Sequence, residues 1–180
     1  MTSLPKAEED AGMTVWASRY SERFVASPWL ALLGVLALSQ TAHLFEHVAQ
    51  MVQMHVLGLS GASARGIVGQ FDIEWVHFVW NAWVLAALLV VLSRFRMNPW
   101  LLGVTLFAGW RFMEHVTMIA TYLRTGVVGS PGFLSSGGLI LGGLPIGRPD
   151  LHFLYNLAET VPLLIGWVVE LRPSELRAPA

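Results

Sequence analysis

The stretch that decides the fold is residues 28–59, PWLALLGVLALSQTAHLFEHVAQMVQMHVLGL. Residues 28–38 are apolar, and residues 39–59 carry three histidines and a glutamate. A helix needs about 20 predominantly apolar residues to cross the hydrocarbon core of a bilayer. The stretch therefore predicts a membrane-spanning helix with polar side chains toward one end.

Three further apolar stretches follow, and together they predict an all-α integral membrane protein, a four-transmembrane-helix up-down bundle. Ser27 and Asn98 each precede a proline, which is typical of a helix N-cap followed by Pro at the first helical position. Asp72 and Asp150 are the expected N-caps of the other two helices. The expected spans are residues 28–59, 72–92, 99–123 and 150–169.

The chain divides into a transmembrane domain, residues 28–171, with a short tail on either side. In the tail of residues 1–27, Trp16, Tyr20 and Phe24 recur every four residues. This spacing predicts a short amphipathic helix that lies on the membrane surface. Residues 172–180 form the C-terminal tail.

Composition excludes several classes of function. Only 13% of the residues are charged, whereas soluble domains carry about 25%. The net charge of −1 excludes a nucleic-acid partner held by phosphate contacts. The chain has no cysteine, which excludes disulfides, thiolate zinc sites and iron–sulfur clusters. The lipid bilayer is the partner that composition predicts.

Basic residues predict the orientation, because they are enriched in cytoplasmic segments. The N-terminus, the loop after the second span and the C-terminus hold Lys6, Arg19, Arg23, Arg94, Arg96, Arg172 and Arg177. The other two loops hold Arg65, Arg124 and Arg148. We therefore expect a plasma or inner membrane protein with both termini in the cytoplasm.

Ionisable residues inside the spans are the main signal for function, because each costs at least about 2.5 kcal/mol on insertion scales. Residues three, four or seven apart share one face of a helix, and every span carries one such polar stripe. In an up-down bundle all four stripes fall at similar depth, on the outward side of the membrane. They contain His43, Glu46, His47, Glu74, His77, Glu114, His115, His152 and Glu159.

This set predicts a metal site that serves a metal-dependent membrane oxidoreductase acting on a small or lipophilic substrate. The expected metal ligands are His43, His47, His77, His115, His152 and Glu74. The expected catalytic residues are Glu46, Glu114 and Glu159, which would bridge, orient ligands or move protons. Some polar residues would instead have a structural role, such as Arg111 pairing with Glu114.

The residue types indicate which metals fit. His43 and His47 lie four residues apart, a spacing that chelates zinc, copper or iron on a helix. Met51, Met54 and Met118 add thioethers, which favour Cu(I). Copper or iron is therefore favoured, with zinc open. A haem needs two facing histidines, but the surplus of carboxylates argues against it.

Two other interpretations stay open. The first is a non-catalytic protein that binds or passes copper, or an accessory subunit of a membrane complex. The second is a purely structural subunit, and association with further copies or with a partner subunit fits all of these. The string His43-Leu-Phe-Glu-His47 also matches the H-x-x-E-H pattern of some zinc proteases, but the surrounding context of those soluble enzymes is absent.

The segment of residues 126–149 is unusual for an exposed loop, since it has eight Gly, three Pro and one charge. An apolar, glycine-rich loop beside the polar cluster favours a lid or a re-entrant segment that admits a lipophilic substrate. The alternative is an irregular hairpin packed on its own bundle or on a partner.

Overall fold

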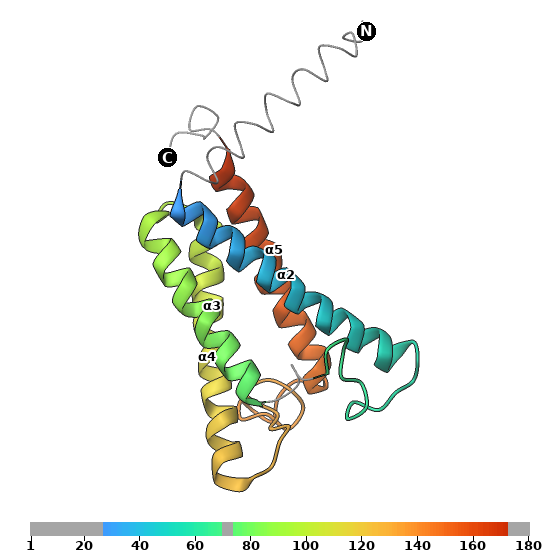
Figure 1. The fold of residues 1–180 in the computed structure, drawn as a ribbon. Helices are drawn as coiled ribbons and strands as arrows, with labels where there is room; N and C mark the ends of the chain where they lie inside the picture. Colours follow the sequence, from blue (N-terminus) through green and yellow to red (C-terminus); the bar gives the residue numbers. More distant parts are fainter. Residues whose placement is uncertain (1–26, 70–73, 173–180) are drawn as a thin grey trace, which may run out of the picture.

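The computed structural model of the chain describes residues 27–69 and 74–172. Within these ranges the protein is all-helical, and Figure 1 shows its four long helices. The interfacial helix expected in residues 1–27 lies outside the described residues, apart from Ser27, and so does most of the C-terminal tail. The helices are α2 (Pro28–His55), α3 (Glu74–Arg94), α4 (Pro99–Thr125) and α5 (Arg148–Leu171).

The starts of α2 and α4 follow the predicted capping. The Ser27 side chain accepts a hydrogen bond from Leu30 N, and Asn98 accepts from Trp100 N and Leu101 N. These contacts satisfy amide groups that have no partner within the first helical turn. Both predicted N-caps are therefore confirmed.

The prediction for the start of α5 was wrong. Its N-cap is Gly147, and Asp150 lies inside the first turn. Pro149 explains the earlier start, because proline is favoured in the first turn of a helix, and the carboxylate of Asp150 there complements the positive end of the helix dipole. Asp72, the other expected N-cap, lies outside the described residues.

The helix ends differ from the predicted spans by a few residues. α2 ends at His55 instead of residue 59, whereas α3 and α4 run on to Arg94 and Thr125. Gly126 closes α4 with φ of 70°, a left-handed conformation that favours glycine.

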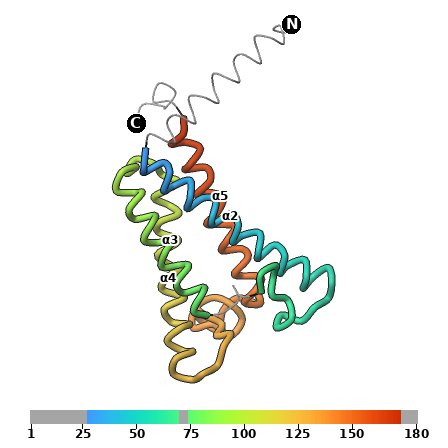
Figure 2. The backbone as a smooth tube through the Cα atoms, viewed as in Figure 1, coloured from blue at the N-terminus to red at the C-terminus, as the bar shows by residue number. Residues whose placement is uncertain are grey.

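Consecutive helices run in opposite directions, and each packs against two others. α2 lies along α5 and α3 lies along α4, while contacts between α2 and α3 and between α4 and α5 complete the ring (Figure 2). The two long connections, which follow α2 and α4, therefore lie at one end of the bundle. The first residue of α2 and the last of α5 lie at the other end.

Three of the helices, α2, α3 and α5, are long and apolar enough to cross a membrane. α4 has 27 residues, but it is less apolar because Arg111, Glu114 and His115 lie near its middle. The sequence predicts four spans, and for α4 the span remains a prediction.

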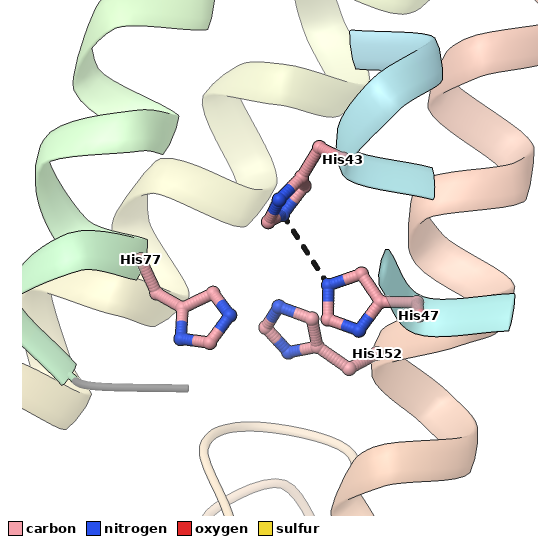
Figure 3. Close-up of side chains that lie close together, drawn as sticks. All are labelled: His43, His47, His77 and His152. Carbon is pink, nitrogen blue, oxygen red and sulfur yellow. Dashed lines mark hydrogen bonds between the residues drawn. The ribbon is translucent and has the colours of Figure 1, made fainter. Parts of the chain in front are cut away.

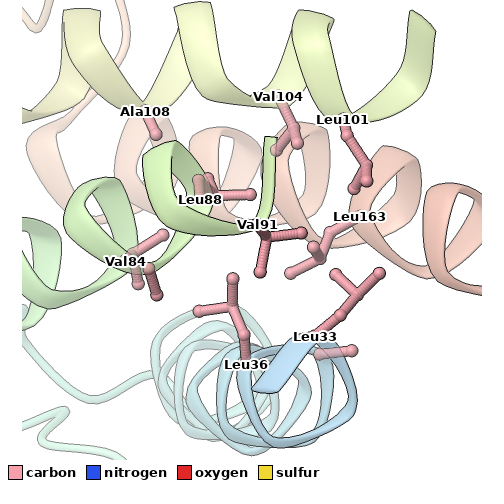
Figure 4. Packing of buried hydrophobic residues seen from close by; sticks show 11 residues of the cluster. Leu33, Leu36, Val84, Leu88, Val91, Leu101, Val104, Ala108 and Leu163 are labelled. Carbon is pink, nitrogen blue, oxygen red and sulfur yellow. The ribbon is translucent and has the colours of Figure 1, made fainter. Parts of the chain in front are cut away.

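The bundle has an apolar half and a polar half. The apolar half lies toward the start of α2, where Leu33, Leu88, Val91, Leu101 and Leu163 are fully shielded from solvent (Figure 4). The polar half lies toward the two long connections and holds buried histidine, glutamate, asparagine and arginine side chains. The apolar half thus packs the helices, and the polar half contains the candidate site.

We expect Gly166→Val to destabilise the bundle, because a Cβ at Gly166 would lie 2.8 Å from Leu101 Cδ2 and 3.4 Å from Trp100 Cβ. Overpacking of this kind costs about 1–3 kcal/mol. The measurement is thermal unfolding of the purified protein in detergent. Gly103→Val is the matched control, since a Cβ at Gly103 meets nothing within 4 Å. Equal melting temperatures for the two variants would contradict the packing described here.

Candidate metal centre

Four buried histidines converge in the polar half of the bundle. His43 and His47 come from successive turns of α2, His77 from α3 and His152 from α5 (Figure 3). Each offers one ring nitrogen, and these four atoms all lie within 4.8 Å of one another. His43 Nε2 and His47 Nε2 are 3.3 Å apart. Four imidazole nitrogens gathered from three helices form a donor set that fits one metal ion.

His77 is the histidine whose hydrogen bonding is least satisfied. It is 3% exposed, and neither of its ring nitrogens has a hydrogen-bond partner. A buried polar atom without a partner costs about 1–3 kcal/mol. A metal ion bound to one of these nitrogens would offset part of that cost.

His47 is oriented by its neighbour on the next turn. Its Nδ1 lies 2.7 Å from Gln50 Oε1. An amide oxygen only accepts hydrogen bonds, so Nδ1 donates and Nε2 keeps its lone pair, the one directed toward His43. Metal-binding histidines commonly hold their other ring nitrogen in this way.

His115, the fifth predicted histidine ligand, lies beside the group of four but not within it. Its ring stacks on His77 with centroids 5.8 Å apart and lies 5.2 Å from the ring of His152. Its Nδ1 is buried and has no hydrogen-bond partner. The remaining histidine, His55, lies at the exposed end of α2 and contacts Asp150 at 2.6 Å.

A buried ion pair lies next to the histidines. Arg111 of α4 pairs with Glu159 of α5, and both side chains are almost completely shielded from solvent. The expected pairing of Arg111 with Glu114 was therefore wrong, because the guanidinium is directed toward α5 rather than along its own helix. Arg111 also donates to Asn156 Oδ1 at 3.2 Å, and its NH2 lies 3.3 Å from His152 Nε2.

This polar layer continues across the bundle. Gln40 of α2 donates to Asn156 Oδ1 at 3.1 Å and to Glu159 Oε2 at 3.2 Å. Trp80 of α3 donates to Gln40 Oε1 at 3.0 Å, and its ring stacks on His43 with centroids 4.8 Å apart. All four helices are thus joined by one network beside the histidines.

The other three glutamates of the predicted site contact the long connections instead of the histidines. Glu46 accepts hydrogen bonds from Val68 N and Gly69 N. Glu114 accepts from Phe133 N at 2.7 Å, in a contact so close that a Cβ at Gly132 would meet its carboxylate at 2.6 Å. These carboxylates hold the backbone of both connections against the helices.

Glu74 does the same at the start of α3, with an added ion pair. Its two oxygens accept from Arg148 NH1 at 2.7 Å and NH2 at 3.0 Å, and Oε1 also accepts from Gly129 N at 3.0 Å. The predicted metal ligand Glu74 thus joins α3, α5 and the loop after α4.

That loop folds as a compact hairpin on its own bundle. Phe133 O and Leu134 O accept from Ile140 N and Leu144 N, and Ser136 N donates to Ile146 O. The apolar side chains at its tip are exposed, and Leu141 is fully so.

A cavity of about 340 Å³ lies between the two long connections and reaches the histidines. Residues from both connections line it, among them Ala62, Ala64 and Val128. His47, His77 and His152 also line it, whereas His43 does not. Three of the four histidines therefore lie on the wall of a cavity at the end of the bundle where the connections lie.

Sequence reasoning assigned no specific contact to Gln40, Trp80 or Arg148. Gln40 lies three residues before His43 on the same helix, and His77 and Trp80 are also three apart. This spacing is compatible with a place on the polar faces, but no pattern in the sequence pairs Gln40 with Asn156 or Arg148 with Glu74.

No family model, curated protein or solved structure matches the chain. The function is therefore inferred from the geometry of the site.

We expect Glu74→Gln to loosen the loop after α4, because it removes the charge that pairs with Arg148. Breaking a buried pair by removing one partner costs about 3–5 kcal/mol, and the effect is smaller here because the Arg148 side chain is 22% exposed. Hydrogen exchange at the Gly129 amide should accelerate about tenfold or more.

Asp150→Asn is the matched control for that loop. It breaks the contact between His55 and Asp150, whose side chains are 58% and 32% exposed, and exposed pairs contribute only about 0–1 kcal/mol. Equal exchange rates at Gly129 in both variants would show that Glu74 does not anchor the loop.

Proposed function

We propose that this chain is an integral membrane protein that binds a metal ion through His43, His47, His77 and His152. The observation that carries the proposal is the convergence of four buried ring nitrogens within 4.8 Å. The unpartnered nitrogens of His77 support it, as does the contact between Gln50 and His47. A buried imidazole in a purely structural role would be expected to find a hydrogen-bond partner, and His77 has none.

The surface of the bundle supports insertion in a membrane, with α4 as the fourth span. The ionisable residues of α4 near its middle are buried, whereas Leu102, Leu106 and Met113 on the same helix are exposed. Large apolar side chains are also exposed on α2, α3 and α5. Exposed apolar surface of this extent is typical of a membrane or protein interface.

For the orientation, we propose cytoplasmic termini and a site near the outer side of a plasma or inner membrane. The excess of basic residues at the termini and in the loop after α3 supports this arrangement.

Within this function, we propose that the protein is a metal-dependent oxidoreductase for a small or lipophilic substrate. The support is the cavity that reaches three of the four imidazoles, because catalytic metal sites keep an open position whereas structural ones are closed. Imidazole donors suit copper, iron and zinc, and copper or iron would supply the redox chemistry.

The second candidate is a copper-handling protein without catalysis. It is favoured by Met118, which lines a small cavity together with Glu114 and His152, because a thioether near an imidazole suits Cu(I). Turnover of an electron donor or acceptor by the loaded protein separates the two candidates.

The test of metal binding compares two histidine variants. Purified wild-type protein should hold about one metal ion per chain by mass spectrometry, as expected for a single set of four ligands. His77→Ala should lose most of that metal, because it removes one of the four ligands and the only one from α3. His55→Ala should keep it, since His55 lies outside the group. A metal-free wild-type protein, or equal loss in both variants, would refute the site.

The orienting contact gives an independent test. Gln50→Leu should weaken metal binding about 10–100-fold, the range for loss of a partner that orients a ligand. Gln50→Glu should retain the affinity, because its carboxylate still accepts from His47 Nδ1. Competition with a chelator measures both affinities, and similar weakening in the two variants would contradict the proposed orientation of His47.

A further inference from the structure

The four histidines are not equivalent with respect to access. His47, His77 and His152 line the cavity between the long connections. The ring of His43 stacks on Trp80 and is not part of the cavity wall. An ion held by the four imidazoles would therefore have its open position on the cavity side, away from His43.

The cavity wall indicates what kind of molecule fits. Its volume of about 340 Å³ lies within the range of about 300–1,000 Å³ typical of sites for small organic ligands. The histidines and Gln50 form its polar end, and Ala62, Ala64 and Val128 line it from the connections.

The charges on the wall are balanced. Among the described residues that line the cavity, the charged ones are Glu74 and Arg148, and two hydrogen bonds pair them with each other. The wall therefore adds no unpaired charge to the site. An apolar body beside the wall meets no isolated ionic group.

We propose that this cavity binds a molecule that has one nitrogen or oxygen donor and an apolar body about the size of an aromatic ring. The donor reaches the metal on the side away from His43, and the apolar body lies against Val128 and Ala62. This inference rests on the proposed metal site and adds the class of ligand that the site takes.

The test uses the full chain in detergent, loaded with Co²⁺, whose visible absorption reports changes in its ligands. Imidazole and 4-phenylimidazole are titrated at about pH 8, where both are mainly neutral. The phenyl group should tighten binding about tenfold or more, since burying apolar surface contributes about 25 cal/mol per Å².

Two neighbouring valines give a matched pair of variants. Val127 and Val128 are both exposed, at 63% and 68%, but Val128 alone of the two lines the cavity. Val128→Trp should weaken 4-phenylimidazole binding about tenfold through steric exclusion, and Val127→Trp should leave it unchanged. Ala62→Phe, with Ser63→Phe as its control, repeats the comparison on the other connection.

The outcomes separate this inference from the metal site. If Co²⁺ binds but the phenyl group adds no affinity, or if both members of each variant pair behave alike, the cavity proposal is wrong and the metal site stands. If the wild-type protein holds no Co²⁺, both proposals fail. Co²⁺ content and melting temperature are measured for every variant, so loss of ligand binding is compared only between folded, loaded proteins.

Discussion

The structure depends on one constraint, which is that polar groups buried between helices need partners. Hydrogen bonds across three helices join Gln40, Asn156, Arg111 and Glu159, and Trp80 brings in the fourth helix. Within this group only Arg111 Nε and Glu159 Oε1 are buried without a partner. In the same layer, both ring nitrogens of His77 have no hydrogen-bond partner. One of them lies within 4.8 Å of ring nitrogens of three other histidines, and this position is what points to a metal ion.

The division into two halves lets the bundle tolerate this layer. Leu33, Leu88, Leu101 and Leu163 pack without exposure in the apolar half, and the close approach of α4 to α5 there needs a glycine at position 166. That packing holds the helices together at one end. At the other end the long connections cover the polar residues, and the carboxylates of Glu46, Glu74 and Glu114 hold them in place.

The contacts of these three glutamates could not be predicted from residue types and their spacing. Their spacing placed them on the polar faces beside the histidines, and a carboxylate near histidines suggests a metal ligand or a base. The structure instead directs their oxygens to backbone amides of Val68, Gly129 and Phe133. A long connection without helical periodicity offers no sequence pattern that predicts where its amides lie, so these contacts were not foreseeable.

The sequence by itself determined the four helices, two of their caps and the side of each helix that carries polar residues, because helical periodicity and capping are local properties. Together with the up-down order of the helices, those properties also predicted five histidines at similar depth. Only the tertiary structure decided which of them share a centre: His43, His47, His77 and His152 converge, whereas His115 lies just outside. It also decided that Arg111 pairs with Glu159 on α5. The physical reason is that the rotation of each helix about its axis and the course of the connections depend on packing between distant segments, which no local pattern records.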